Sequence, residues 1–103
     1  MNEQEMIRKL NSVGKTVFVL YFRLFLEYAE GKISKDKCID ELVEDKVSNY
    51  NGASIRCSNA KKIFDKKMEC DALMTISKSR RLSSEVIQMA KKIITERCDG
   101  TKN

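Results

Sequence analysis

The sequence predicts an all-α, single-domain protein, a single compact bundle of five to six helices, on three observations. The 103-residue chain holds no proline and only four glycines, too few turn residues for an all-β fold. Apolar residues recur every three or four positions over most of its length. Five of the seven aromatic residues fall within residues 16–30, which indicates a hydrophobic helix at the centre. We expect one domain over residues 1–103, with 1–5 and 98–103 frayed.

The stretch of about residues 13–30 is predicted to form this central helix. Its polar side chains fall on one narrow stripe, so the other helices must cover most of its circumference. The stripe consists of Thr16, Arg23, Glu27 and Glu30, and Gly31 supplies a left-handed stop. The apolar run is interrupted by Arg23 and is far shorter than the ~20 residues of a membrane span, so we expect no membrane partner.

Shorter helices are expected on both sides of this stretch. Ser34 and Ser83 stand in N-cap positions, where a hydroxyl accepts a bond from a free main-chain N–H. An Asn-Gly pair makes residues 48–52 the clearest turn in the chain. In chain order the expected helices are 2–11, 13–30, 35–47, one that begins between 53 and 58 and runs to 67, then 68–77 and 84–97.

The four cysteines are interpreted as reduced thiols of a cytoplasmic protein. Cys38, Cys57, Cys70 and Cys98 include no CxxC pair, and the chain has no histidine, so neither a zinc site nor another metal site is expected. A disulfide framework is the less favoured alternative, because the acidic and polar start of the chain is unlike a secretory signal.

Catalysis is not expected from this composition. Histidine, the usual general base and activator of nucleophiles, is absent. Cys57 beside Arg56 is the one candidate nucleophile, and a small core residue is the favoured interpretation of it. The acidic residues 40, 41, 44 and 45 fit a solvated helix face better than a cation site. No phosphate-binding glycine loop is present, so the sequence predicts neither an enzyme nor a cofactor.

The net charge of +5 is concentrated in the second half, where residues 52–103 carry twelve basic and six acidic side chains. Two short helices, 68–77 and 84–97, joined by a polar linker, have the proportions of a helix-turn-helix. We therefore predict nucleic-acid binding by the second half, with DNA favoured over RNA. The candidate contacts are Arg56, Ser58, Asn59, Lys62, Lys66, Lys78, Arg80, Arg81, Lys91 and Lys92.

The alternative is a protein–protein interaction module, an adaptor or inhibitor. A chain of this size is short for covering so wide an apolar arc, and an uncovered strip of the central helix would serve a homodimer or a partner. The basic half would then meet an acidic protein surface. A lysine-rich face that only keeps the protein hydrated also fits the composition.

Overall fold

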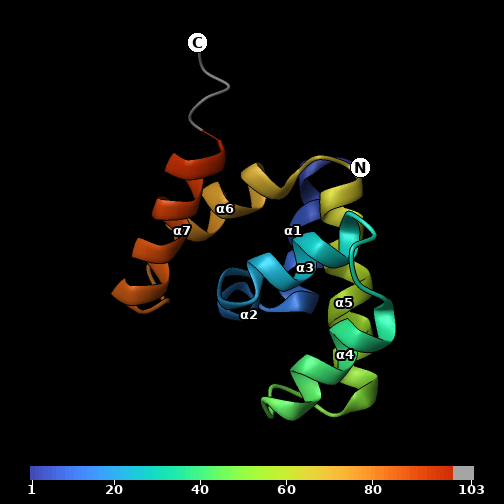
Figure 1. The fold of residues 1–103 in the computed structure, drawn as a ribbon. Coiled ribbons are helices and arrows are strands. Elements are labelled where there is room, and N and C mark those ends of the chain that lie inside the picture. The colour runs from blue at the N-terminus through green and yellow to red at the C-terminus, as the bar shows by residue number, and fades with distance from the viewer. Residues whose placement is uncertain (99–103) are drawn as a thin grey trace.

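The computed structural model describes residues 1–98, which form seven helices and no strand (Figure 1), so the all-α prediction is confirmed. The helices are α1 (Glu3–Val13), α2 (Lys15–Leu20), α3 (Phe22–Ala29), α4 (Lys35–Glu44), α5 (Tyr50–Asp65), α6 (Glu69–Ser77) and α7 (Ser84–Arg97). The longest of them, α5, packs against α1, α3, α4 and α6. On the other side of the molecule α7 packs against α6 and α2.

The stretch predicted as one central helix is divided in the structure. Val13 ends α1, and Gly14 forms a corner with φ +92°, a conformation that favours glycine. At Tyr21 the backbone leaves helical geometry, with φ −112° and ψ 24°, and separates α2 from α3. Tyr21 is bonded on both sides of the distortion, because its N–H donates to Val17 O at 2.9 Å and its oxygen accepts from Phe25 N at 3.0 Å. The segment is therefore a bent pair of short helices.

This bent pair carries most of the aromatic core. Phe18 lies between three other rings, with centroid distances of 5.8 Å to Phe22, 6.3 Å to Phe25 and 5.7 Å to Phe64 of α5. Phe22 and Phe64 also contact each other, at 5.2 Å. All four rings are buried, so the apolar arc of this segment is covered on the side that faces α5.

Side-chain caps explain where α4, α5 and α7 begin. The Ser34 hydroxyl accepts a bond from Lys37 N at 3.1 Å and the Ser83 hydroxyl one from Val86 N at 3.2 Å, as the sequence predicts. The turn predicted at residues 48–52 is wrong, because Asn49 caps α5 by accepting a bond from Gly52 N at 2.8 Å. A Cβ on Gly52 would lie 3.0 Å from Ser48 Cβ, so this glycine permits a close approach within the first helical turn.

Three helices end with the same main-chain pattern. After α3, Lys32 N bonds Glu27 O and Gly31 N bonds Tyr28 O, with Gly31 at φ +78°, the left-handed stop that the sequence predicts. Two lysines take the corresponding position after α4 and α5, Lys46 at φ +61° and Lys67 at φ +58°. Glycine is the usual residue in this conformation, because a side chain there is strained. Since lysine takes its place after α4 and α5, no sequence signal marks these two helix ends.

The N-terminal residues expected to fray lie in or beside α1. Asn2 caps that helix by accepting a bond from Glu5 N at 2.8 Å, and Met1 packs against the core. At the other end Cys98 is buried, and residues 99–103 of the expected frayed tail lie outside the described part of the chain. Within residues 1–98, no helix combines the length and hydrophobicity needed to cross a membrane.

Candidate nucleic-acid interface

The ten residues predicted to contact nucleic acid fall into two groups on different sides of the molecule. Arg56, Ser58, Asn59, Lys62 and Lys66 belong to α5 or its end, whereas Lys78, Arg80, Arg81, Lys91 and Lys92 belong to the α6–α7 linker and α7. Figure 1 shows α5 on one side and α7 on the other, with α2 and α6 between them. Lys78 at the end of α6 shares a hollow with Glu3 and Ile7 of α1, whereas the linker arginines and the α7 lysines lie apart from the α5 group.

Three residues of the α5 group, Asn59, Lys62 and Lys66, face α1 across a shallow groove, which we call the α1–α5 groove. Helix α1 lies beside α5 and runs in the opposite direction, so Ser12 is near Asn59 and Met1 is near Lys66. Two adjoining hollows of about 260 and 500 Å³ follow the groove and share Glu5 and Lys9 in their walls. From Asn59 to Lys66 the groove extends about 10 Å along the axis of α5.

Four cations line this groove: Arg8 and Lys9 from α1, and Lys62 and Lys66 from α5. The groove also holds two carboxylates, Glu5 and Asp65. Asp65 is already paired within α5, because its carboxylate accepts a bond from Lys61 Nζ at 2.8 Å and raises the pKa of that amine. Residues 1–98 contain one other ion pair, between Lys32 and Glu30, so none of the four cations in the groove has an ion-pair partner there.

The remaining polar residues of α5 are placed differently. Asn59 lines the smaller hollow, although its amide also donates a bond to Ile55 O at 3.0 Å. Ser58 is half-buried and lines neither hollow. Arg56 donates a bond from Nη1 to the main-chain oxygen of Val13, at the end of α1. Its guanidinium is used inside the fold, so we remove Arg56 from the candidate interface.

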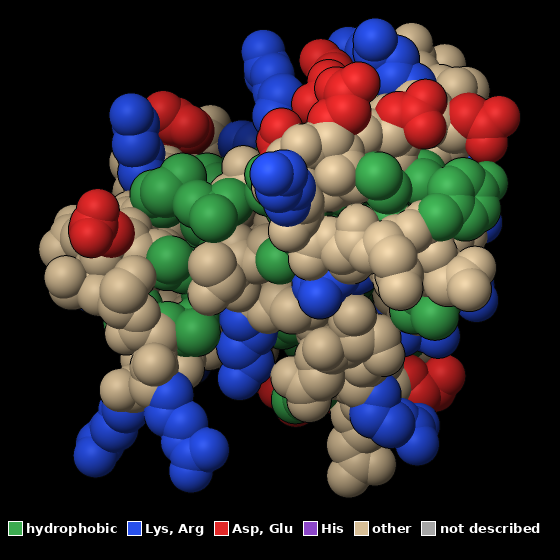
Figure 2. Space-filling view, turned by 90° about the horizontal axis from the view of Figure 1, so that it is seen from below, with side chains coloured by type: hydrophobic (Ala, Val, Ile, Leu, Met, Phe, Trp, Pro, Cys, Tyr) green, Lys and Arg blue, Asp and Glu red, His purple; other side chains and the backbone are tan. Residues whose placement is uncertain are grey.

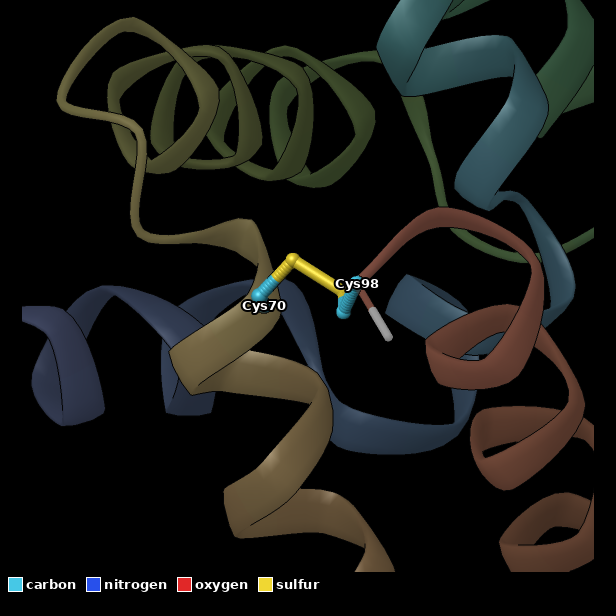
Figure 3. The surroundings of a disulfide bond; sticks show 2 residues. All are labelled: Cys70 and Cys98. Carbon is cyan, nitrogen blue, oxygen red and sulfur yellow. A yellow bond between two sulfur atoms is a disulfide. The ribbon is translucent and has the colours of Figure 1, made fainter. Parts of the chain in front are cut away.

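The second group lies on a hairpin formed by α6 and α7 (Figure 1). Its linker carries Lys78, Arg80 and Arg81, all exposed, and α7 carries the exposed Lys91 and Lys92. Figure 3 shows that a disulfide joins Cys70 in the first turn of α6 to Cys98 at the end of α7. The far ends of the two helices are thus held 6.1 Å apart between Cα atoms. In a helix-turn-helix the helices diverge at about 90–120°, whereas this hairpin is closed at both ends.

This disulfide corrects the prediction that all four cysteines are reduced. Cys70 and Cys98 are separated by 28 positions, and the sequence does not show that antiparallel packing of α6 and α7 brings them together. The sequence predicts reduced thiols together with a cytoplasmic location, whereas disulfides persist mainly in oxidising compartments. The Cys70–Cys98 pair therefore gives no support to that location.

Cys38 and Cys57 remain free thiols, buried between α4 and α5. Their Sγ atoms lie 2.9 Å apart, and this contact together with burial raises the pKa of the Cys38 thiol. Cys57 is fully buried, and the neighbouring Arg56 is bound to Val13, so the core interpretation of Cys57 fits its surroundings. Among residues 1–98 there is no group of three or more Cys, Asp or Glu side chains that could hold a metal ion.

Another surface hollow lies between the α2–α3 pair and α7, and we call it the α2–α7 groove. It has a volume of about 380 Å³ and apolar walls, formed by Leu20, Phe22 and Leu26 on one side and by Met89 and Ile93 on the other. Arg23, Glu96 and Arg97 complete it, and the Arg97 guanidinium lies 5.9 Å from the centre of the Phe22 ring. Leu20 is 51% exposed and Met89 39% exposed, so part of the predicted central stretch is uncovered.

Comparison with known proteins gives no further assignment: no protein-family model, curated protein or solved structure matches the chain. The candidate interface therefore depends on the groove residues alone. Sequence reasoning missed Arg8 and Lys9, because the first 31 residues carry equal numbers of basic and acidic side chains. The positions of Arg8 and Lys9 in the sequence do not indicate that these side chains lie across a groove from Lys62 and Lys66.

Proposed function

We propose that the protein is a non-catalytic nucleic-acid-binding protein that holds the phosphodiester backbone in the α1–α5 groove. The observation that carries this proposal is the set of four cations, Arg8, Lys9, Lys62 and Lys66, that line adjoining hollows and have no ion-pair partner among residues 1–98. Cations that face one another across a concave surface attract a chain of phosphates more strongly than the same charges scattered over a convex one.

The size of the groove fits a short stretch of backbone. One DNA strand carries a phosphate every ~3.4 Å of helix axis, so about three phosphates match the ~10 Å length of the groove. The hydroxyl of Ser12 and the amide of Asn59 add neutral hydrogen-bonding groups at one end. These contacts recognise the backbone and carry no base readout, so the groove offers no preference for a particular base sequence.

Two double variants of equal charge change compare the two basic groups. Lys62→Ala with Lys66→Ala removes half the cations of the groove, and Arg80→Ala with Arg81→Ala removes two exposed cations of the α6–α7 linker. Fluorescence anisotropy with a labelled DNA duplex, a single DNA strand and an RNA strand measures the affinity of each protein. We expect the lysine variant to bind all three at least about tenfold more weakly, because each lost phosphate contact costs a similar amount for any sequence.

We expect the arginine variant to bind as the wild type does. An equal loss of affinity in both variants would show that the hairpin also binds nucleic acid. A loss of affinity in the arginine variant alone would place the interface on the hairpin and contradict the groove proposal. Far-UV circular dichroism of both variants controls for folding, since all four side chains are exposed and contribute little to the core.

A further inference from the structure

The α2–α7 groove leaves large apolar side chains in contact with water on a face that the proposed nucleic-acid interface does not use. Leu20 and Met89 stand at its two walls and are among the few large hydrophobic residues of the chain that are exposed. Exposed apolar side chains that line a hollow are typical of a docking site. The occupant must supply apolar side chains and be compatible with a groove that carries two arginines, Arg23 and Arg97, and one carboxylate, Glu96.

A second apolar surface with the opposite charge lies elsewhere on the same chain. We call it the α4–α5 corner: the end of α4, where Val43 is 38% exposed, and the start of α5, where Tyr50 is 57% exposed. Helix α4 also carries Asp40 and Glu44, both exposed and without an ion-pair partner among residues 1–98. The corner thus presents apolar side chains beside carboxylates, which complements the groove.

Figure 2 shows the groove side and the corner side on one face of the molecule. Hydrophobic side chains gather at the left, on the side of α2 and α7, and again at the right, on the side of α4 and α5. Acidic side chains gather above the right-hand group. A twofold rotation about an axis in the plane of this face, between the two groups, places the corner of each copy opposite the groove of the other.

We propose that two copies of this chain form a twofold dimer in which the α4–α5 corner of each copy docks into the α2–α7 groove of its partner. The dimer contains this contact twice, so two modest patches combine into one interface. Arg23 and Arg97 of one copy then lie near the free carboxylates of the other. The arrangement covers Met89 of α7 and Leu20, which belongs to the predicted central stretch and is left exposed by the chain itself.

Sedimentation velocity without nucleic acid tests the proposal. The wild type is measured over a concentration series from about 1 µM to about 1 mM, a range that detects weak and moderate dimers. Leu20→Glu changes the groove and Tyr50→Glu changes the corner, and each should raise the dimer dissociation constant at least tenfold. Met74→Glu is the matched control, because Met74 is 40% exposed on α6 and belongs to neither surface. This control should dimerise as the wild type does.

A mixture of Leu20→Glu and Tyr50→Glu proteins makes the test specific. In a heterodimer the intact corner of the Leu20→Glu copy meets the intact groove of the Tyr50→Glu copy, so one of the two contacts is complete. The mixture should therefore form heterodimers at concentrations where each variant alone is monomeric. Met89→Glu replaces Leu20→Glu if circular dichroism shows that the latter is unfolded. A wild type that stays monomeric over the whole range overturns the proposal. The proposal is also overturned if Leu20→Glu and Tyr50→Glu each dimerise as the wild type does, or if the mixture of the two does not associate.

Discussion

Arg56 of α5 donates a hydrogen bond from its Nη1 to the main-chain oxygen of Val13, the last residue of α1. The bond fixes the corner at which α1 ends and α2 begins. A Cβ on Gly14 would lie only 2.9 Å from the same nitrogen, so the glycine leaves room for the guanidinium. A cation that the charge pattern assigned to nucleic acid therefore stabilises the junction of three helices.

Replacement of Arg56 should affect stability and leave binding unchanged. Arg56→Ala removes a charged donor from a carbonyl that is partly buried, and we expect the free energy of unfolding to fall by roughly 1.5–3 kcal/mol. Chemical denaturation measures the loss, and anisotropy with labelled DNA checks the affinity. An affinity loss equal to that of the double lysine variant, without a loss of stability, would return Arg56 to the interface.

The left-handed position after α5 predicts a stabilising substitution. Lys67 holds φ +58°, which strains a side chain, whereas glycine adopts it freely but loses more entropy on folding. We expect Lys67→Gly to raise the free energy of unfolding by about 0.5–1 kcal/mol. Lys66→Gly is the control, since Lys66 at φ −90° gains nothing from glycine. Equal effects of the two changes in thermal or urea denaturation would contradict the assigned helix end.

The disulfide between Cys70 and Cys98 should be measurable in both stability and thiol content. Closing a loop of this length restricts the unfolded chain, so reduction should lower the free energy of unfolding by about 2–4 kcal/mol. The double variant Cys70→Ser with Cys98→Ser should show the same loss and no further response to reductant. Thiol titration of the unreduced, denatured protein should find two thiols, Cys38 and Cys57. Four thiols would disprove the pairing.

Alkaline pH should weaken the contact between Tyr21 and Asp45. The phenol donates to Asp45 Oδ2 at 2.9 Å, and burial, followed by this bond, raises the pKa of Tyr21 above its ordinary value of 10.0. At a pH between the unfolded-state and the folded-state pKa, the folded protein therefore retains the phenolic proton that the unfolded chain releases. Its stabilising effect is full below pH 10 and is lost as the pH rises through the folded-state pKa.

Tyr21→Phe should accordingly reduce the fall in stability between pH 10 and 11, measured by urea denaturation. The loss at neutral pH should be small, below about 1 kcal/mol, because the bond is exposed to solvent. Tyr50→Phe serves as the control, since its side chain is exposed at the start of α5. A pH dependence of Tyr21→Phe identical to that of the wild type would show that this contact is absent in solution.

The sequence predicts the helical class and the capped helix starts, because these depend on local patterns such as Ser34 and Ser83. It misses the bend at Tyr21, where no proline or glycine marks the change. It places the ends of α4 and α5 two to three residues too late, because lysines, Lys46 and Lys67, take the left-handed positions there. The Cys70–Cys98 pair is hidden for a related reason: it depends on how α6 and α7 pack.

Two of the four cations in the candidate interface can be grouped from the sequence. Lys62 and Lys66 are four residues apart on one helix and can be grouped from spacing alone. Their partners across the groove, Arg8 and Lys9, are more than fifty residues away, and only the packing of α1 against α5 joins them. Charge counted along the chain cannot separate this group from the cations of the hairpin.

The salt dependence of wild-type binding to a short DNA duplex tests the central claim most directly. Binding that releases counterions from about three phosphates should give a plot of log K against log salt concentration with a slope of about −2.7, at about −0.9 per phosphate. The affinity should fall steeply between about 50 and 200 mM salt, and single strands should show a somewhat shallower slope. Absence of binding at the lowest salt concentration, or an affinity that does not change with salt, would contradict the claim that the α1–α5 groove binds a phosphodiester backbone.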